Sequence, residues 1–497
     1  MQLPSKPASE AIISCPFVLS PRPRTVIARS LGPIYPVACL PSPDPNDHET
    51  TICGAQQRLC RVLPLAKKGF YREFAHFVSE WCDRNILPID HAADVSFETW
   101  LSHTMYPEWR KEELRLVHDS LISINKASTK MSSFIKREFY PCYKHSRWIN
   151  SRSDQAKVIW GPYCKLIENL VYQHPSFIKH VPIADRPAYI KNLLGPIGPY
   201  YATDYTAFES HFVPKLMESC ELVLYRRALI HFPEVFTFVR NMLLGVNQCY
   251  TRSGVSVSIP ARRMSGDMNT SLGNGFTNYM LTLFLASRSR SSIQSVVEGD
   301  DSLFVVLGGW KPTCKEFADC GMTIKIETFT SFAHASFCGF IADEDELMAI
   351  ADPVKRILSF GWTLSPRMHA GIKIRKSLLL AKALSLGFEL PNCPVLWALS
   401  LSIVRFLKGV KPIFDYDGYH VFPFPSYRVA PPGPKTRVLF EEKYGYSITQ
   451  QMEIEDYFLN RECPVHPFDS FVIPYNLIHW DCFDYFAKYA HSYHTCN

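Results

Sequence analysis

The chain has 497 residues, of which 47% are hydrophobic, 13% aromatic and 20% charged, and its formal net charge is +6. This composition excludes a disordered or fibrous protein and fits a globular chain that buries a sizeable core. The length allows either about three compact domains or one large fold whose lobes share a core.

The 16 cysteines are scattered and do not have the spacing of a disulfide framework, and the first residues show no signal-peptide pattern. We therefore expect reduced thiols in the cytosol. No apolar run approaches the ~20 residues that a bilayer-spanning helix needs, and the best one, Tyr279 to Ala286, ends at Ser287 and Arg288. The sequence predicts no intrinsic transmembrane segment, so any membrane attachment is expected through a partner or a surface helix.

The first elements along the chain are an irregular arm and a helix. Ten of the first forty-five residues are proline, which fixes its own φ and disfavours helix in the residue before it. We expect an extended, irregular arm there, and regular structure from about Thr51. A core-facing helix is then predicted by apolar residues at helical spacing, namely Phe70, Phe74, Phe77, Val78 and Trp81.

A basic stretch runs from Lys126 to Lys165. It holds nine Lys or Arg against only Glu138 and Asp154, so its local positive charge exceeds the net charge of the whole chain. Such clustering indicates a ligand rich in phosphate. A solvated basic face is the alternative that the residues leave open.

Two later segments end in carboxylates. An aromatic-rich run from Tyr200 to Thr203 predicts a strand that ends at Asp204. A helix is predicted after it by the apolar residues Leu216, Cys220, Val223 and Leu224. Between Val296 and Val306, two apolar stretches flank a Glu-Gly-Asp-Asp-Ser run and predict a hairpin. Adjacent carboxylates such as Asp300 and Asp301 disfavour each other's ionisation unless a cation compensates.

Magnesium is the cation that fits such a group, because it takes oxygen ligands from one or two carboxylates and from substrate phosphates. Two such ions can support in-line phosphoryl transfer, and Asp204 offers the third carboxylate that this chemistry wants. A Gly-Asp-Asp triplet alone is a weak signal, because an exposed turn can carry the same residues.

Between these two segments, Arg262 to Gly275 is a polar, glycine-containing loop that runs into an apolar helix. Its Ser-Gly start offers a hydroxyl and free backbone donors to a sugar-phosphate chain, and Asn274 is a candidate to reach a ribose 2′-hydroxyl. The alternative is an ordinary helix N-terminus capped by Ser265 or Asp267.

After Asp352 the pattern is helical as far as Lys408, and the remainder is rich in Pro, Tyr and Phe. The aromatic segment 416–427 is a candidate stacking platform for a nucleotide, although a packed loop accounts for it equally well. No zinc-ligand spacing is found among the His and Cys residues near the end, which are His479, Cys482, His491, His494 and Cys496.

Three motifs stand in a fixed order. They are D-x4-E from Asp204 to Glu209, S-G-x3-T-x3-N with Ser265, Gly266, Thr270 and Asn274, and G-D-D from Gly299 to Asp301. The set resembles motifs A, B and C of the RNA-dependent RNA polymerases of positive-strand RNA viruses. The second motif is especially similar to the tombusvirus-like branch.

The resemblance extends to three further motifs. Lys325, after Gly321 and Met322, is similar to the motif D lysine, which implies a general acid for the leaving pyrophosphate. The run Phe337, Cys338, Gly339 resembles motif E, the turn that grips the priming end. The nucleotide-binding motif F is resembled by basic residues around Glu138, namely Lys136, Lys144, Arg147 and Arg152.

The resemblance implies roles for the core motifs. Asp204, Asp300 and Asp301 would be catalytic and would hold two Mg²⁺ ions, which Mn²⁺ can replace. Substrate would be bound by the basic residues just named and by five residues of motifs A and B, namely Glu209, Ser265, Gly266, Thr270 and Asn274. The resemblance also implies that Glu209 holds Asn274 and the incoming ribose. Many relatives have Asp at this position, so the longer side chain puts the strength of ribose discrimination in question.

The implied fold is an α+β right-hand polymerase with fingers, palm and thumb in an encircled closed hand. The expected parts are an N-terminal arm at 1–50, fingers at 51–198 and 212–262, a palm at 199–211 and 263–345, and a thumb with a C-terminal extension at 346–497.

The implied function is replication of a viral RNA genome. The expected partners are template RNA, product RNA, NTPs and other viral replicase proteins, and the expected location is the host cytoplasm, at membrane-associated replication sites reached through partners. Two other classes stay open. One is a reverse transcriptase or another palm-type nucleotidyltransferase, and the other is a non-catalytic RNA-binding replicase scaffold.

Overall fold

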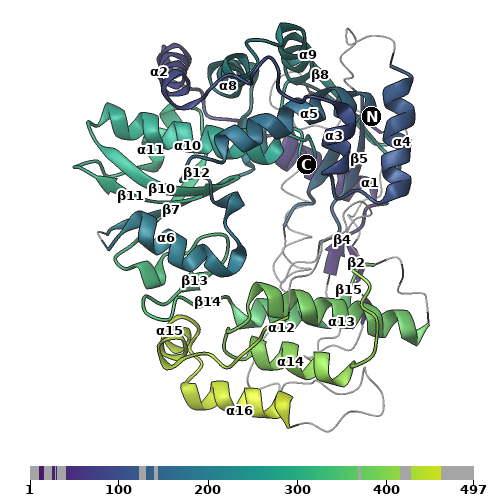
Figure 1. Cartoon of the computed structure of the whole chain (residues 1–497), viewed down its shortest axis with the longest axis vertical. Helices are drawn as coiled ribbons and strands as arrows, with labels where there is room; N and C mark the ends of the chain where they lie inside the picture. Colours follow the sequence, from purple (N-terminus) through teal and green to yellow (C-terminus); the bar gives the residue numbers. More distant parts are fainter. Residues whose placement is uncertain are drawn as a thin grey trace.

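The computed structural model describes most of the chain. It covers residues 11–15, 25–27, 29–30, 41–121, 130–138, 144–196, 198–365, 367, 371–414 and 427–460. Helices alternate with mainly antiparallel sheets, so the α+β class predicted from the sequence is confirmed. Two sheets occupy the middle and upper part of the molecule, and a group of helices lies below them (Figure 1).

A four-stranded antiparallel sheet lies at the centre, in the order β10-β11-β7-β12. Its strands are β7 (Tyr200–Tyr205), β10 (Ser292–Glu298), β11 (Asp301–Leu307) and β12 (Ile324–Phe329). The predicted strand before Asp204 is therefore present as β7. The predicted hairpin is β10 and β11, joined through Gly299, whose φ of +63° suits glycine.

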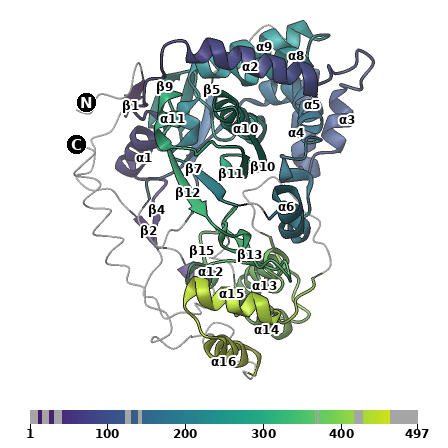
Figure 2. The same cartoon turned by 90° about the vertical axis from the view of Figure 1, so that its left-hand side faces the viewer.

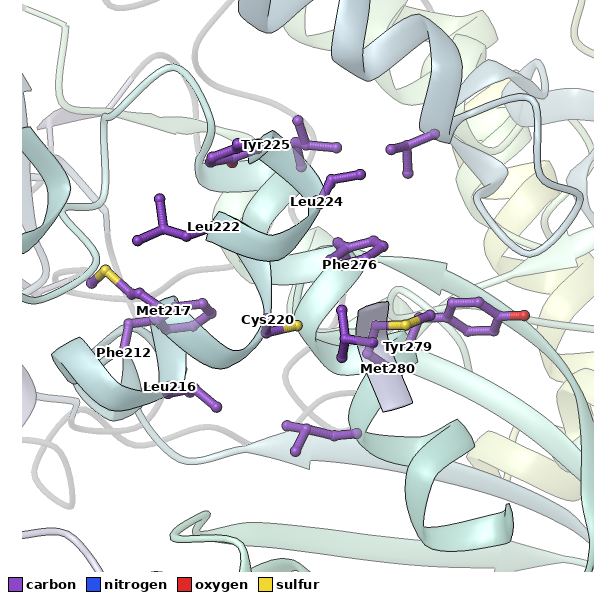
Figure 3. Close-up of a cluster of buried hydrophobic side chains, with 14 of the residues drawn as sticks. Phe212, Leu216, Met217, Cys220, Leu222, Leu224, Tyr225, Phe276, Tyr279 and Met280 are labelled. Carbon is purple, nitrogen blue, oxygen red and sulfur yellow. The ribbon is translucent and has the colours of Figure 1, made fainter. Parts of the chain in front are cut away.

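Helix α10 (Thr270–Arg288) covers one face of this sheet and is buried on almost every side. Its apolar run from Tyr279 to Ala286 is thus the core of the protein. Figure 3 shows Phe276, Tyr279 and Met280 of this helix beside side chains of two helices that follow β7. None of the helices in the described part of the chain has the length and apolar character needed to cross a membrane.

The two helices after β7 are α7 (Pro214–Ser219) and α8 (Glu221–Ala228). The sequence predicts one continuous helix there. The structure breaks it at Cys220, whose φ of −130° and ψ of −87° are not helical, while the side chain is fully buried. The helical pattern was correct, and its continuity was wrong.

A second, five-stranded sheet has the order β1-β9-β8-β5-β6, with β5 and β8 parallel. Its strands are β1 (Ile12–Ser14), β5 (Lys130–Ile135), β6 (Trp148–Arg152), β8 (Val246–Thr251) and β9 (Ser256–Pro260). The described part of the N-terminal arm is extended, as expected, but it forms short strands. Besides β1 these are β2 (Thr25–Ile27), β3 (Arg29–Ser30) and β4 (Pro41–Pro43).

Further helices surround the two sheets (Figure 2). The predicted helix from Phe70 is α2 (Phe70–Asn85), which buries Phe74, Val78 and Trp81. The others are α1 (His48–Gly54), α3 (Phe97–Ser102), α4 (Glu108–Asp119), α5 (Asp154–Val171), α6 (Arg186–Leu194), α9 (Pro233–Leu244) and α11 (Cys314–Asp319). Short turns complete this part, namely η1 (Ala55–Leu59), η2 (Ile178–His180), η3 (Ile183–Asp185), η4 (Phe208–His211) and η5 (Phe332–His334).

The C-terminal part is helical, as predicted, and has a hydrophobic core of its own. It holds α12 (Pro353–Phe360), α13 (Ile372–Glu389), α14 (Leu396–Phe406), α15 (Pro434–Tyr444) and α16 (Ile448–Leu459). The strands β13 (Ile341–Ala342), β14 (Ala349–Ile350) and β15 (Trp362–Thr363) connect it to the rest. Of the aromatic segment 416–427 only Tyr427 is described, and the five C-terminal His and Cys residues lie outside the described residues.

We predict that Gly161→Ala lowers the free energy of unfolding by about 1–3 kcal/mol, because α5 and α3 touch at this glycine. A methyl group there would lie 2.5 Å from the ring carbons of Trp100. The control is Gly309→Ala, since nothing lies within 4 Å of that position. Chemical denaturation of both variants measures the effect, and equal stabilities would show that the two helices adjust freely.

Candidate active site

The register of the central sheet brings predicted site residues to one face. Lys325 of β12 is the direct partner of Asp204 on β7, and on the other side Ser302 pairs with Thr203. Asp301 therefore stands next to Asp204 across the ladder. Because opposed residues of antiparallel strands point to the same face, all three side chains face the same space.

That space is a pocket of about 200 Å³, which we call the carboxylate pocket. It is lined by Ala202, Thr203, Asp204, Asp301, Ser302, Lys325, Glu327, Ser336, Phe337, Cys338 and Gly339. The predicted motifs A, C, D and E thus contribute to one pocket. The turn at its far wall is sharp, with positive φ at Cys338 and Gly339.

Negative charge is concentrated beside this pocket. Burial and the neighbouring Asp300 raise the pKa of Asp301 to about 6. Burial, followed by the charge of Glu209, also raises the pKa of Asp300, while Arg147 acts in the opposite direction. A bound cation would relieve this repulsion, so the carboxylates have the oxygen chemistry and the electrostatic need of a Mg²⁺ site.

The donors are not gathered into a closed metal cage. In the described part of the chain, no three Asp, Glu, His or Cys side chains are close enough to hold a metal ion by themselves. The arrangement fits an ion that takes one or two ligands from the protein and the rest from substrate and water, which is the usual behaviour of Mg²⁺ with phosphates.

Lys325 lies at the open side of the carboxylate pocket. Its side chain is exposed and pairs with Glu327, and the hydrogen bond to Glu327 raises the pKa of Lys325. Glu327, two residues further along the strand, thus stabilises the protonated form of the Lys325 ammonium group. A protonated lysine beside the pocket is chemically able to donate a proton.

The turn that carries Asp300 is fixed to α10 by Asn278. Its Nδ2 donates to the carbonyl oxygens of Asp300, at 2.9 Å, and of Gly299, at 3.3 Å. The side chain is fully buried. This residue was not predicted from the sequence, although its position one helical turn after Asn274 places it on the same face of the helix.

The polar loop before α10 rests on β6. The backbone N–H of Asn150 donates to the carbonyl of Ser265 at 2.6 Å. Gly266 has a φ of +119°, and a Cβ at this residue would meet the carbonyl oxygen of Asn150 at 2.7 Å, so only glycine fits. The helix begins at Thr270, whose hydroxyl donates to the carbonyl of Asp267, and neither Ser265 nor Asp267 is its N-cap.

The basic residues divide into two groups. Lys136 and Arg147 are about one third exposed and share Glu138, at 2.5 Å and 3.7 Å. Arg147 is close enough to favour the ionised form of Asp300, so this part of the basic stretch reaches the carboxylates. Lys144 is exposed.

Arg152 has different contacts from those expected. Its side chain is buried and bonds Asp267 through two oxygens, at 2.7 Å and 2.9 Å, and Asn247 at 3.1 Å. The structure therefore does not bring this guanidinium to the carboxylate pocket, and the paired arginine instead anchors the loop before α10. Its nucleotide contact stays a prediction that this geometry does not favour.

The structure also does not show the expected pairing of Glu209 with Asn274. Glu209 lies on η4 near Asp300, and no hydrogen bond joins it to Asn274 within the described residues. The side-chain oxygen Oδ1 of Asn274 accepts instead from Nε of Arg263, at 3.1 Å.

The segment after β7 is tied to β12 by a buried histidine. Nδ1 of His211 lies 3.2 Å from the carbonyl of Phe208, and Nε2 lies 2.9 Å from the backbone N–H of Thr323. Because the N–H of Thr323 can only donate, Nε2 accepts and Nδ1 carries the proton. Burial lowers the pKa of His211 to about 4, which keeps the ring neutral.

Comparison with known proteins shows which proteins the region of the candidate site is similar to. Residues 245–379 match the family model described as RNA dependent RNA polymerase. This span includes the loop before α10, the Gly299–Asp301 turn and Lys325, whereas Asp204 precedes it. The match covers less than half of the chain.

The chain is also similar to individual viral proteins named RNA-directed RNA polymerase. That of Greasy grouper nervous necrosis virus is 29% identical over 293 residues, or 55% of this chain, and that of Striped jack nervous necrosis virus 26% over 289 residues. That of Maize chlorotic mottle virus, a tombusvirus-like relative, is 23% identical over 253 residues. The resemblance stated from the motifs is thereby confirmed. The matched part covers only 28% of each fish-virus protein and 25% of the plant-virus protein.

We predict that His211 makes the protein sensitive to acid. A pKa of about 4 in the folded state, against 6.5 for the free group, means that folding favours the neutral ring. Its contribution is complete above pH 6.5 and is lost as the pH falls towards 4, by about 2 kcal/mol at pH 5. Urea denaturation at pH 7.5 and pH 5 measures it.

The non-titrating variant His211→Gln provides the comparison. It is less stable than wild type at pH 7.5, and the gap narrows at pH 5. A gap that stays constant between the two pH values contradicts the assignment.

Proposed function

We propose that this chain is an RNA-dependent RNA polymerase that replicates a viral RNA genome by template-directed nucleotidyl transfer from NTPs. The observation that carries the proposal is the register of β7, which sets Asp204 beside Asp301 and Lys325 in one pocket. The similarity of residues 245–379 to polymerases of this class supports it. The chain aligns with only part of the length of these relatives.

We propose the right-hand arrangement for the fold. The central sheet and α10 are the palm, at 199–211 and 263–345, and the five-stranded sheet with its helices belongs to the fingers, at 51–198 and 212–262. The helices after residue 346 form the thumb, and the arm at 1–50 helps to close the hand. In support, β1 of the arm pairs with β9 of the proposed fingers, and β3 pairs with β15 beyond residue 346.

The carboxylate pocket suggests how the residues divide the chemistry. Asp204, Asp300 and Asp301 would hold two divalent ions, which supply activation of the attacking 3′-hydroxyl and neutralise charge on the phosphates. Lys325 would donate a proton to the leaving pyrophosphate. Arg147 would bind the triphosphate of the incoming NTP, because its guanidinium group is close enough to Asp300 to act against the rise in the pKa of that carboxyl group.

The other contacts follow from the same proposal. Lys136 and Lys144 would contact phosphates, Ser265 and Gly266 the template or product backbone, and Asn274 the ribose of the NTP. The partners would be template RNA, product RNA, NTPs and other replicase proteins. The place of action would be membrane-associated sites in the host cytoplasm, reached through those partners.

We predict that Asp300→Asn reduces nucleotide incorporation by more than about 100-fold, because it removes a charge that the metal ions need. The fold should survive, since burial and neighbouring acids already disfavour the ionised form of Asp300. The measurement is primer extension on a defined RNA template with Mg²⁺, together with the melting temperature, which should stay the same or rise.

The matched control is Asp119→Asn on α4, where the carboxylate is exposed. It should retain wild-type activity. Undiminished synthesis by Asp300→Asn would refute the proposed role. Wild-type protein that uses dNTPs in preference to NTPs would indicate a reverse transcriptase, and RNA binding without synthesis would indicate a scaffold.

A further inference from the structure

A fully buried ion pair lies behind the loop that precedes α10. Nη2 of Arg263 lies 2.5 Å from Oε2 of Glu221, and both side chains are 0% exposed. The guanidinium also lies over the ring of Phe212, with its Cζ 4.4 Å from the ring centroid. Phe212 directly follows η4, the turn that carries Glu209, so Arg263 connects the segment after β7 with α8.

The same arginine makes one contact with a predicted substrate-binding residue. Its Nε donates to Oδ1 of Asn274 at 3.1 Å. Arginine has donors and no acceptor, so the oxygen of the Asn274 amide must face Arg263, and the NH₂ group must face the other way. In the described part of the chain this NH₂ group makes no hydrogen bond, and it is not among the polar atoms that are sealed from solvent.

Several neighbours fix the position of the arginine. Oε2 of Glu221 also accepts from the hydroxyl of Tyr225 and from Nδ2 of Asn269, each at 3.2 Å. Gly273, the residue before Asn274, leaves no free room, since a Cβ there would lie 2.3 Å from Nη2 of Arg263 and 2.5 Å from Oε2 of Glu221. The guanidinium therefore packs closely against α10 at Gly273.

This network is poorly suited to stability alone. Nη1 of Arg263, Oε1 of Glu221 and Oδ1 of Asn269 are buried without a hydrogen-bond partner in the described structure. A buried ion pair gains little over apolar packing even when every atom is satisfied, and unsatisfied atoms make it worse. An arrangement that is retained at such a disadvantage points to a role in function.

We propose that Arg263 is a positioning residue for ribose selection. It holds the oxygen of the Asn274 amide so that the NH₂ group is presented to the substrate as a donor, and a ribose 2′-hydroxyl oxygen is the acceptor that this donor reads. A 2′-deoxynucleotide lacks that acceptor. The inference rests on the proposed polymerase function, because it assigns Asn274 to the incoming nucleotide.

The test variant is Arg263→Lys, which keeps a positive charge for Glu221 and removes the Nε donor to Asn274. The measured quantity is the ratio of kcat/KM for an NTP to kcat/KM for the matching 2′-dNTP, in primer extension with Mg²⁺. We expect this ratio to fall about fivefold to tenfold, the equivalent of one hydrogen bond. A general loss of activity would lower both terms and leave the ratio unchanged.

The matched control is Arg262→Lys, the neighbouring buried arginine, which donates to the carbonyl of Ala261 and makes no hydrogen bond to Asn274 within the described residues. It should keep the wild-type ratio. A double-mutant cycle tests the route of action. In the Asn274→Ala background, Arg263→Lys should produce no further change in the ratio, and an additive change would overturn the inference.

The outcomes separate the two proposals. Wild-type protein without template-directed synthesis removes the proposed function, and the inference with it. Synthesis by wild type together with an unchanged ratio in folded Arg263→Lys removes the inference alone. If this variant does not fold, Gly273→Ala replaces it, since the added methyl group displaces the guanidinium while Arg263 and Asn274 are retained, and an unchanged ratio there overturns the inference.

Discussion

Antiparallel pairing on both sides of β7 fixes the distance between groups that lie up to 121 residues apart in the chain, on the scale of one strand spacing. A slip of one residue on either ladder would turn Asp301 or Lys325 to the opposite face, towards the core beneath α10. The buried aromatic side chains of that face, such as Tyr201 and Phe304, therefore specify the candidate site as much as its polar residues do.

This arrangement brings together acidic side chains that repel one another. The pKa values of Asp300 and Asp301 are both raised, so electrostatic stress is concentrated at the candidate site. Its surroundings offset that stress only in part. Arg147 approaches from the five-stranded sheet, and Asn278 holds the turn through its backbone and leaves the carboxylates free. Negative charge that the protein leaves partly uncompensated is available to a ligand.

The parts of the fold that the sequence predicted are those with local patterns. The helix from Phe70, the strand before Asp204 and the hairpin around Gly299 each follow from periodicity or turn chemistry within a few residues. The candidate site was predicted to the extent that motifs carry it, and the sheet register then brought Asp204, Asp301 and Lys325 together.

The side-chain contacts that were not predicted from the sequence join residues far apart in the chain. Whether Arg152 lies in solvent or in a buried pair is decided by Asp267, which is 115 residues away, and a count of basic residues cannot distinguish the two. The same holds for the contact of Arg263 with Glu221, 42 residues earlier. In both cases the residue type indicates a charge, and only the tertiary structure shows whether that charge is paired inside the protein.

The pairing of β1 with β9 can form only late in the synthesis of this part of the chain. β1 leaves the ribosome well before its partner β9, which is translated more than 200 residues later. At ~5–20 residues per second the early strand waits on the order of ten seconds or longer, with its backbone groups unpaired. Until β9 emerges, the nascent chain exposes an open strand edge, a stage at which chaperones have reason to bind it.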